Sequence, residues 1–189
     1  WTEVWIGGDP SGHIQVTGRD EKGRKQYIYH SDWAQVRDNA KYSRLLPFAE
    51  ALPQLRAQVD ADLRGRALTW NKVAALAVDL LDKTRIRVGN PEYQRQNESY
   101  GLTTLQDQHV EIHGDKITFM FQGKSGKEHT VQLRDKRLAR LVRQCQELPG
   151  QELFQYLDDD KAQHILRSND VNHYLREVTG QDFTAKDFR

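Results

Sequence analysis

The sequence predicts an α+β chain, in which part of a small β-rich N-terminal domain precedes a mainly helical domain with a three-stranded antiparallel sheet. Three observations lead to this prediction. Two short alternating runs near the N-terminus flank a Gly- and charge-rich turn, an apolar helical repeat begins near residue 70, and three more alternating runs follow between residues 110 and 133. We expect the two domains to be 1–45 and 46–189.

The first alternating runs, Ile14–Thr17 and Gln26–Tyr29, predict a hairpin across the turn at 18–23. Strand side chains alternate between faces, so Ile28 should face the core, and Tyr27 and Tyr29 should share the opposite face.

A helix should start at Ser31 or Asp32, whose side chains can cap it, and should run towards Arg44. Pro47 and Pro53 then interrupt the chain.

The clearest helix is expected at 70–86, where apolar residues recur on one face, and Gly89 and Pro91 should end it. The alternating runs that follow predict a meander of three strands separated by Gly-containing turns. These strands are Val110–Ile112, Ile117–Gln122 and His129–Leu133. Two amphipathic helices should follow, at 135–147 and near 168–178.

Composition excludes several classes of protein. The 189 residues contain no apolar run of the roughly 18 residues that a membrane helix needs. The single cysteine, Cys145, rules out an internal disulfide framework and a multi-cysteine zinc site. Its side chain is expected to be buried as a small apolar group, and the protein is expected in a reducing compartment. The chain begins at Trp1 and its only methionine is Met120, so we expect it to be part of a larger protein.

Charge is unevenly distributed along the chain. The net charge is +1, but residues 151–160 contain four acids and no base, so the remainder carries +5. An overall charge near zero therefore does not exclude a nucleic-acid partner. The acidic segment itself is expected to be a solvated turn.

Known enzyme motifs are absent: there is no phosphate-binding loop, no dinucleotide fingerprint and no metalloprotease motif. The pair His109 and His113 is expected to be solvated rather than metal-binding, so no metal or cofactor is expected. What remains is a dispersed set of cations near turns: Arg87, Lys124 and the Lys186-Asp-Phe-Arg189 segment. Two guanidinium groups and one ammonium group suit a phosphoryl transition state, because the forks grip oxygens and the lysine can protonate a leaving group. The alternative is that these are ordinary surface charges.

Several longer motifs, taken in order, resemble the type IB DNA topoisomerases, and most closely their small bacterial, poxvirus-type branch. These motifs are Gly-Arg-Lys-Gln-Tyr-Ile-Tyr-His at 23–30, Arg-Ile-Arg-Val-Gly-Asn-Pro-Glu-Tyr at 85–93, Asn-Glu-Ser-Tyr-Gly-Leu-Thr-Thr-Leu at 97–105, Phe-Gln-Gly-Lys-Ser-Gly at 121–126 and Lys-Asp-Phe-Arg at 186–189. The resemblance covers nearly the whole chain. It implies a part of an N-terminal DNA-clamp domain and an incomplete catalytic core, similar to that of tyrosine recombinases.

The resemblance implies relaxation of supercoiled duplex DNA through a transient 3′-phosphotyrosyl link, without ATP or metal. Arg87, on the helix before Gly89, and Arg189 match the two catalytic arginines of the family. Lys124 matches the hairpin lysine that protonates the 5′-hydroxyl leaving group, and Lys186 is expected to aid proton transfer or hold phosphate.

The same resemblance implies DNA contacts. Gln26, Tyr27 and Tyr29 match the strand that lies in the major groove, where Gln pairs with base edges and Tyr offers a flat ring and a hydroxyl. Arg24 and Tyr93 are the next expected contacts. Exposed strand tyrosines and a locally packed Tyr93 are the simpler alternatives.

One departure from the family pattern affects activity. The family's catalytic histidine and tyrosine nucleophile follow the Lys-Asp-Phe-Arg motif, and none of the seven tyrosines here matches that nucleophile. We therefore expect these 189 residues to be unable to cleave DNA alone.

Two other functions remain open. A tyrosine recombinase usually has His-x-x-Arg where this chain has Lys186-Asp-Phe-Arg189. A non-catalytic DNA clamp is the other alternative. For the complete protein we expect duplex DNA as partner, a monomer without nucleotide cofactor, and a bacterial cytoplasmic location at the nucleoid.

Overall fold

The computed structural model describes the backbone of residues 1–189 and the side chains of residues 1–37 and 42–189. The chain divides into two compact units, Trp1–Ala49 and Glu50–Arg189. Each unit is described here by itself. Within the described residues, none of the helices combines the length and the apolar composition needed to cross a bilayer.

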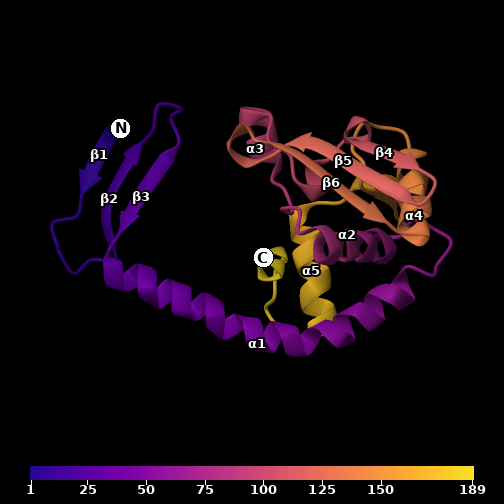
Figure 1. The fold of residues 1–189 in the computed structure, drawn as a ribbon, viewed down its shortest axis with the longest axis horizontal. Coiled ribbons are helices and arrows are strands. Elements are labelled where there is room, and N and C mark those ends of the chain that lie inside the picture. Colours follow the sequence, from indigo (N-terminus) through magenta and orange to yellow (C-terminus); the bar gives the residue numbers. More distant parts are fainter. The chain divides into compact units, whose positions relative to one another are not determined.

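The first unit contains a three-stranded antiparallel sheet in the order β1-β2-β3 (Figure 1). Its strands are β1 (Thr2–Ile6), β2 (Ile14–Arg19) and β3 (Lys25–Tyr29). The expected hairpin is thus confirmed as β2–β3, with Thr17 opposite Tyr27 and Val16 opposite Ile28. Strand β1 was not predicted as a separate element.

The expected burial of Ile28 is wrong, because its side chain is 49% exposed. Its cross-strand partner Val16 is only half-buried, and Ile6, paired with Val16 from β1, is 72% exposed. Among the described residues of this unit, that face of the sheet therefore forms no filled core. Tyr27 and Tyr29 do share the opposite face.

Helix α1 (Ser31–Asp62) continues through both prolines that were expected to interrupt it. A proline inside a helix removes a hydrogen bond and costs about 3 kcal/mol. The compensation comes from apolar side chains spaced three or four residues apart, which are buried: Phe48, Ala51, Leu55, Val59 and, just beyond the helix, Leu63. Tertiary burial thus outweighs the local signal.

The second unit is built around α2 (Trp70–Thr84). Thr69 caps its start, and its side-chain oxygen accepts from the Lys72 amide at 3.4 Å. The helix ends two residues earlier than the predicted 70–86, because Arg85 adopts a left-handed conformation with φ 57° and ψ 20°. Most of the α2 side chains are buried, so this helix forms the centre of the core.

The predicted meander is confirmed. Strands β4 (Val110–His113), β5 (Lys116–Gln122) and β6 (Glu128–Arg134) form an antiparallel sheet in that order (Figure 1). The predicted helices are α4 (Lys136–Gln146) and α5 (Ser168–Thr179). Helix α2 contacts α5 and β6, and α4 contacts β5. Cys145 is buried as expected, and burial raises the pKa of its thiol to about 12.

Short elements complete this unit. They are α3 (Pro91–Asn97), the hairpin of β7 (Gln155–Leu157) and β8 (Gln163–Ile165), and the 3₁₀ turns η1 (Leu102–Thr104), η2 (Asp107–His109), η3 (Lys124–Gly126) and η4 (Ala185–Phe188). Three acids of the 151–160 segment, at 158–160, lie in the β7–β8 turn, and the fourth, Glu152, precedes β7. There Asp158 accepts from the Ala162 amide at 2.8 Å and lies 2.7 Å from His164 Nε2, so at least this acid has a local structural role.

Candidate active site

Arg87 was predicted to lie on the helix before Gly89. It lies instead in the segment that follows α2, because the helix ends at Thr84. Two neighbouring backbone positions anchor this segment. The Arg87 carbonyl accepts from the Leu102 amide at 2.7 Å. The Val88 carbonyl accepts from the amide and the hydroxyl of Thr103 at 2.7 and 2.8 Å. The backbone is thus fixed while the Arg87 side chain stays exposed.

Gly89 and Gly101 allow this contact between segments. A Cβ at Gly101 would lie 2.6 Å from the Arg87 carbonyl oxygen and 2.6 Å from the Gly89 Cα, a separation that real side chains do not tolerate. Gly89 has φ +97°, which favours glycine over any other residue. The chain beside Arg87 therefore requires glycine at both positions.

Residues 99–104, which contact the Arg87 segment, also contact the β5–β6 hairpin. The Tyr100 amide donates to the Gln122 carbonyl at 2.8 Å, and the Ser99 hydroxyl donates to the Gly123 carbonyl at 3.2 Å. Residues 99–104 thus bond to the Arg87 segment on one side and to the hairpin end on the other. The β5–β6 hairpin carries Lys124.

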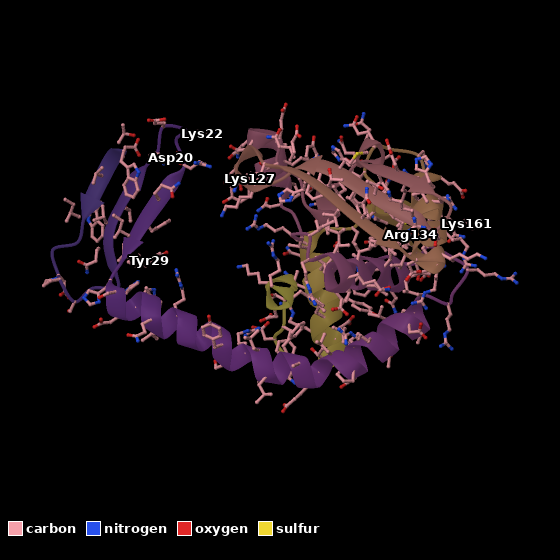
Figure 2. All side chains as sticks on the ribbon, in the orientation of Figure 1. Asp20, Lys22, Tyr29, Lys127, Arg134 and Lys161 are labelled. Carbon is pink, nitrogen blue, oxygen red and sulfur yellow. The ribbon has the colours of Figure 1, made fainter. Side chains whose placement is uncertain are left out.

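Lys124 lies in η3 at the end of the β5–β6 hairpin, as predicted. The Gly123 amide donates to the Lys127 carbonyl at 2.7 Å, and Ser125 adopts φ 69°, so the chain reverses tightly here. Figure 2 labels Lys127 at this end of the hairpin. Lys124 is exposed, and within the described side chains it makes no ion pair.

Lys186 and Arg189 belong to the turn η4 and the residue after it. The Asp187 carboxylate accepts from the Thr184 amide at 2.7 Å, and the buried Phe188 side chain anchors the turn. Turn η4 contacts both α2 and α5. The Phe188 carbonyl, immediately before Arg189, accepts from Arg85 Nη1 at 3.1 Å.

The segments that carry Arg87 and Arg189 are joined by the hydrogen bond from Arg85 Nη1 to the Phe188 carbonyl. Partial burial and the neighbouring Arg87 charge lower the pKa of the Arg189 guanidinium, which nevertheless stays charged at neutral pH. In the part of the chain whose side chains are described, neither arginine is paired with an acid. Other arginines are paired: Arg56 with Asp82 at 2.8 Å and Arg64 with Asp60 at 2.5 Å. Two neighbouring unpaired guanidiniums form a site suited to an anion such as phosphate.

In the first unit, four side chains form a stack on and beside β3, which we call the Tyr27–Tyr29 ladder. The rings of Tyr27 and Tyr29 stack with centroids 6.0 Å apart at 12°. Lys25 Nζ lies 5.5 Å from the Tyr27 ring and the Arg37 guanidinium lies 5.6 Å from the Tyr29 ring. A cation thus lies beside each of two nearly parallel rings.

Arg24 and Gln26 are both held by Asp20 at the β2–β3 turn, which Figure 2 labels. The Asp20 carboxylate accepts from Arg24 Nε at 2.7 Å and from Gln26 Nε2 at 2.9 Å. The hydrogen bond from Arg24, above all, lowers the pKa of Asp20 to about 2. These side chains would reach a base or phosphate only by exchanging or sharing this carboxylate partner.

Tyr93 lies on α3 and is 57% exposed. Among the described residues, no hydrogen bond or ring contact joins it to Arg87, Lys124 or Arg189. The structure therefore leaves its expected role without direct geometric support.

Sequence reasoning missed four contributors: Asp20, Lys25, Arg37 and Arg85. Asp20 has a turn signature, Asp-x-x-Gly, that could have indicated its part in holding the strand. Lys25 is adjacent to the tyrosines, but Arg37 lies on a different element and carries no sequence signal. Arg85 was noted only as the first residue of the 85–93 motif, because its contact with Phe188 joins residues 103 positions apart.

Comparison with known proteins finds relatives of this chain. A family model described as eukaryotic DNA topoisomerase I, catalytic core, matches residues 30–189. The DNA topoisomerase 1B of Acanthamoeba polyphaga mimivirus is 37% identical over 193 aligned residues, covering 100% of this chain and 57% of that protein. The DNA topoisomerase 1B of vaccinia virus (strain Copenhagen) is 34% identical over 115 residues, covering 59% of this chain and 36% of that protein.

A solved structure of the XerH site-specific recombinase bound to difH substrate matches with a TM-score of 0.46 and 13% identity, covering 90% of this chain and 46% of that chain. The chain spans only about half the length of the mimivirus relative and about a third of the vaccinia relative. The family model nevertheless matches well over half of this chain. The chain therefore belongs to the type IB DNA topoisomerase family.

Proposed function

We propose that this chain supplies most of the phosphate-activating groups of a type IB topoisomerase, which relaxes supercoiled duplex DNA by transient cleavage of one strand. The observation that carries the proposal is that the segment bearing Arg87 is joined to the peptide before Arg189, where Arg85 Nη1 donates to the Phe188 carbonyl at 3.1 Å, while neither Arg87 nor Arg189 has an acid partner among the described side chains. Two cations held together repel in the free protein. A phosphodiester placed between them relieves that repulsion, and the added negative charge of a pentacoordinate phosphorus strengthens the interaction further.

In the proposed reaction, a tyrosine hydroxyl attacks the scissile phosphorus, and a bond forms between the tyrosine oxygen and phosphorus. The bond from phosphorus to the 5′-oxygen breaks, leaving a 3′-phosphotyrosyl link. Arg87 and Arg189 bind the non-bridging oxygens, and Lys124 gives a proton to the departing 5′-oxygen. The proton of the attacking tyrosine hydroxyl passes to solvent water, which also returns a proton to Lys124. Lys186 assists by holding phosphate. The nucleophile is not among the residues assigned here, and resealing is the reverse reaction, so neither ATP nor metal is needed.

DNA contact outside the reacting phosphate is proposed for the N-terminal region 1–45 as a clamp, with 46–189 as the catalytic core. Gln26, Tyr27 and Tyr29 would face the duplex, and Arg24 and Tyr93 would add contacts. The geometry of the Tyr27–Tyr29 ladder supports this part, since it fixes two flat rings between two cations. A monomer acting in the cytoplasm at the nucleoid completes the proposal. The relatives named above are viral and lend no support to a bacterial source.

The test is plasmid relaxation by the full-length protein in the presence of EDTA and without ATP, together with single-turnover cleavage of a duplex. Arg189→Ala should slow cleavage by at least about a hundredfold, because it removes an interaction that strengthens in the transition state. Duplex affinity should change by less than about threefold, because the ground state loses little.

The control is Arg64→Ala, which removes an exposed arginine whose partner is Asp60. It should leave both quantities unchanged. A cleavage loss below about threefold for Arg189→Ala would contradict the assigned role.

A further inference from the structure

Arg85 has an unusual backbone conformation for its residue type. It ends α2 in the left-handed region, at φ 57° and ψ 20°, with its amide donating to the Leu81 carbonyl. Glycine is the residue normally favoured at this position of a helix end, because a Cβ is strained there. Arginine at this position therefore carries a backbone cost that glycine would avoid.

The Arg85 guanidinium connects α2 to the peptide that precedes Arg189. Its Nη1 donates to the Phe188 carbonyl at 3.1 Å and lies 3.5 Å from Asp82 Oδ1. That carbonyl belongs to the peptide linking Phe188 to Arg189, so its direction fixes where the Arg189 backbone begins. The Phe188 side chain is buried, so this residue is fixed by its side chain as well as by its carbonyl.

Asp82 is held in turn by a second arginine. Arg56 of α1 donates to both carboxylate oxygens of Asp82, at 2.8 and 3.2 Å. The Asp82 side chain is only 13% exposed, so this paired geometry is sheltered. The result is a continuous chain of contacts from Arg56 through Asp82 and Arg85 to the Phe188 carbonyl.

We propose that Arg85 is a positioning residue for catalysis: it fixes the peptide before Arg189 and thereby aims that guanidinium at the phosphate beside Arg87. The proposal rests on the proposed function, because it concerns the same site. In this proposal Arg85 does not contact the phosphate: its Nη1 donates to the Phe188 carbonyl and lies 3.5 Å from Asp82 Oδ1. A displacement of about 1 Å in a catalytic group can cost on the order of a hundredfold in rate, so one such contact is sufficient to matter.

The experiment uses Arg85→Gly in the full-length protein. Glycine removes the side chain and suits the left-handed backbone, so thermal stability should be retained or increased. The single-turnover cleavage rate should nevertheless fall by about tenfold or more, with duplex affinity within about twofold of the parent. A purely structural role for Arg85 predicts no loss of rate in a variant that is equally stable.

A double-mutant cycle with Arg189→Ala tests whether the two residues act together. If Arg85 acts through Arg189, adding Arg85→Gly to Arg189→Ala should change the cleavage rate by less than about twofold, because no aimed group remains. Independent, multiplying effects would overturn the inference. So would an unchanged rate in Arg85→Gly alone.

Salt dependence separates positioning from direct phosphate contact. In a plot of log affinity against log salt concentration, loss of one phosphate contact reduces the slope by about one. The slope for Arg85→Gly should equal that of the parent, and a reduced slope would overturn the inference. If Arg189→Ala cleaves at the parent rate, the proposed function itself fails. If Arg189→Ala is slow but Arg85→Gly cleaves at the parent rate, only the positioning role of Arg85 fails.

Discussion

Charge pairing distinguishes the arginines of this chain at the scale of single residues. Arg56 and Arg64 each contact an acid at 2.8 Å or less, and such partners neutralise them in the free protein. Arg87 and Arg189 lie near each other with no acid partner among the described side chains. A bound anion would reduce the repulsion between these two charges, and charged groups left without a partner are typical of functional sites.

Lys124 allows a test of the proton-transfer step. Lys124→Ala should slow cleavage of ordinary duplex DNA by about 10²–10⁴-fold, because the 5′-oxygen then leaves without a proton. A substrate with sulfur in place of that bridging oxygen has a much better leaving group that needs no proton. The measurement is single-turnover cleavage of both substrates, and Lys124→Ala should cleave the sulfur substrate at nearly the parent rate.

The matched control for that prediction is Lys127→Ala, which removes a lysine from the same hairpin end but keeps the carbonyl that accepts from Gly123. It should cleave both substrates as the parent does. An equal defect of Lys124→Ala on both substrates would show that the lysine acts on phosphate binding and not on the leaving group.

The sequence predicted the local context of two of the candidate cations but not that of the third. The cations in turns, Lys124 and Arg189, have the expected local context. The position of Arg87 was wrong, because the end of α2 depends on Arg85 taking a left-handed conformation that sequence patterns assign to glycine. A contact with the distant Phe188 accompanies that conformation, and such long-range contacts leave no periodic signal along the chain.

At the scale of elements, the periodic segments were predictable and the irregular ones were not. The β4–β5–β6 meander and helices α2, α4 and α5 follow from apolar spacing and turn residues. Helix α1 does not, because Pro47 and Pro53 locally oppose it and burial of residues such as Leu55 and Val59 decides the outcome. The close contact between residues 87–89 and 99–104 was equally hidden, since it is made by backbone groups.

Gly101→Ala tests how much of the site depends on that backbone contact. The new methyl group would lie 2.6 Å from the Arg87 carbonyl oxygen, so the two segments must separate. We expect a loss of unfolding free energy of about 1–3 kcal/mol, and a cleavage rate at least about tenfold lower at a temperature where the variant is fully folded. Denaturant unfolding and single-turnover cleavage measure the two effects.

Gly65→Ala is the matched control, because the nearest atom to its new Cβ is 3.9 Å away. It should change neither quantity appreciably. A Gly101→Ala variant that loses stability but cleaves at the parent rate when folded would show that the contact supports the fold and not the position of Arg87.

At the scale of the whole molecule, distribution of charge matters more than its sum. The net charge is +1, yet residues 151–160 hold four acids and no base. The structure places these acids at and near the β7–β8 turn, where Asp158 bonds to Ala162 and His164. The remaining +5 is spread over elements that include the Tyr27–Tyr29 ladder and the Arg87 segment. Low net charge is therefore compatible with a DNA-binding surface.

Salt dependence of duplex binding measures how many phosphates the whole surface neutralises, whichever elements supply the cations. The affinity of the full-length protein should fall as salt rises, with a log–log slope of about −0.9 per phosphate contacted. Lys25, at one end of the Tyr27–Tyr29 ladder, is placed to supply one of these contacts, so Lys25→Gln should make the slope less steep by about one. Lys161→Gln, in the acidic β7–β8 turn, removes the same charge and should leave the slope unchanged. If both variants keep the slope of the parent protein, the ladder does not contact the DNA backbone. If both variants reduce the slope by the same amount, binding responds only to net charge.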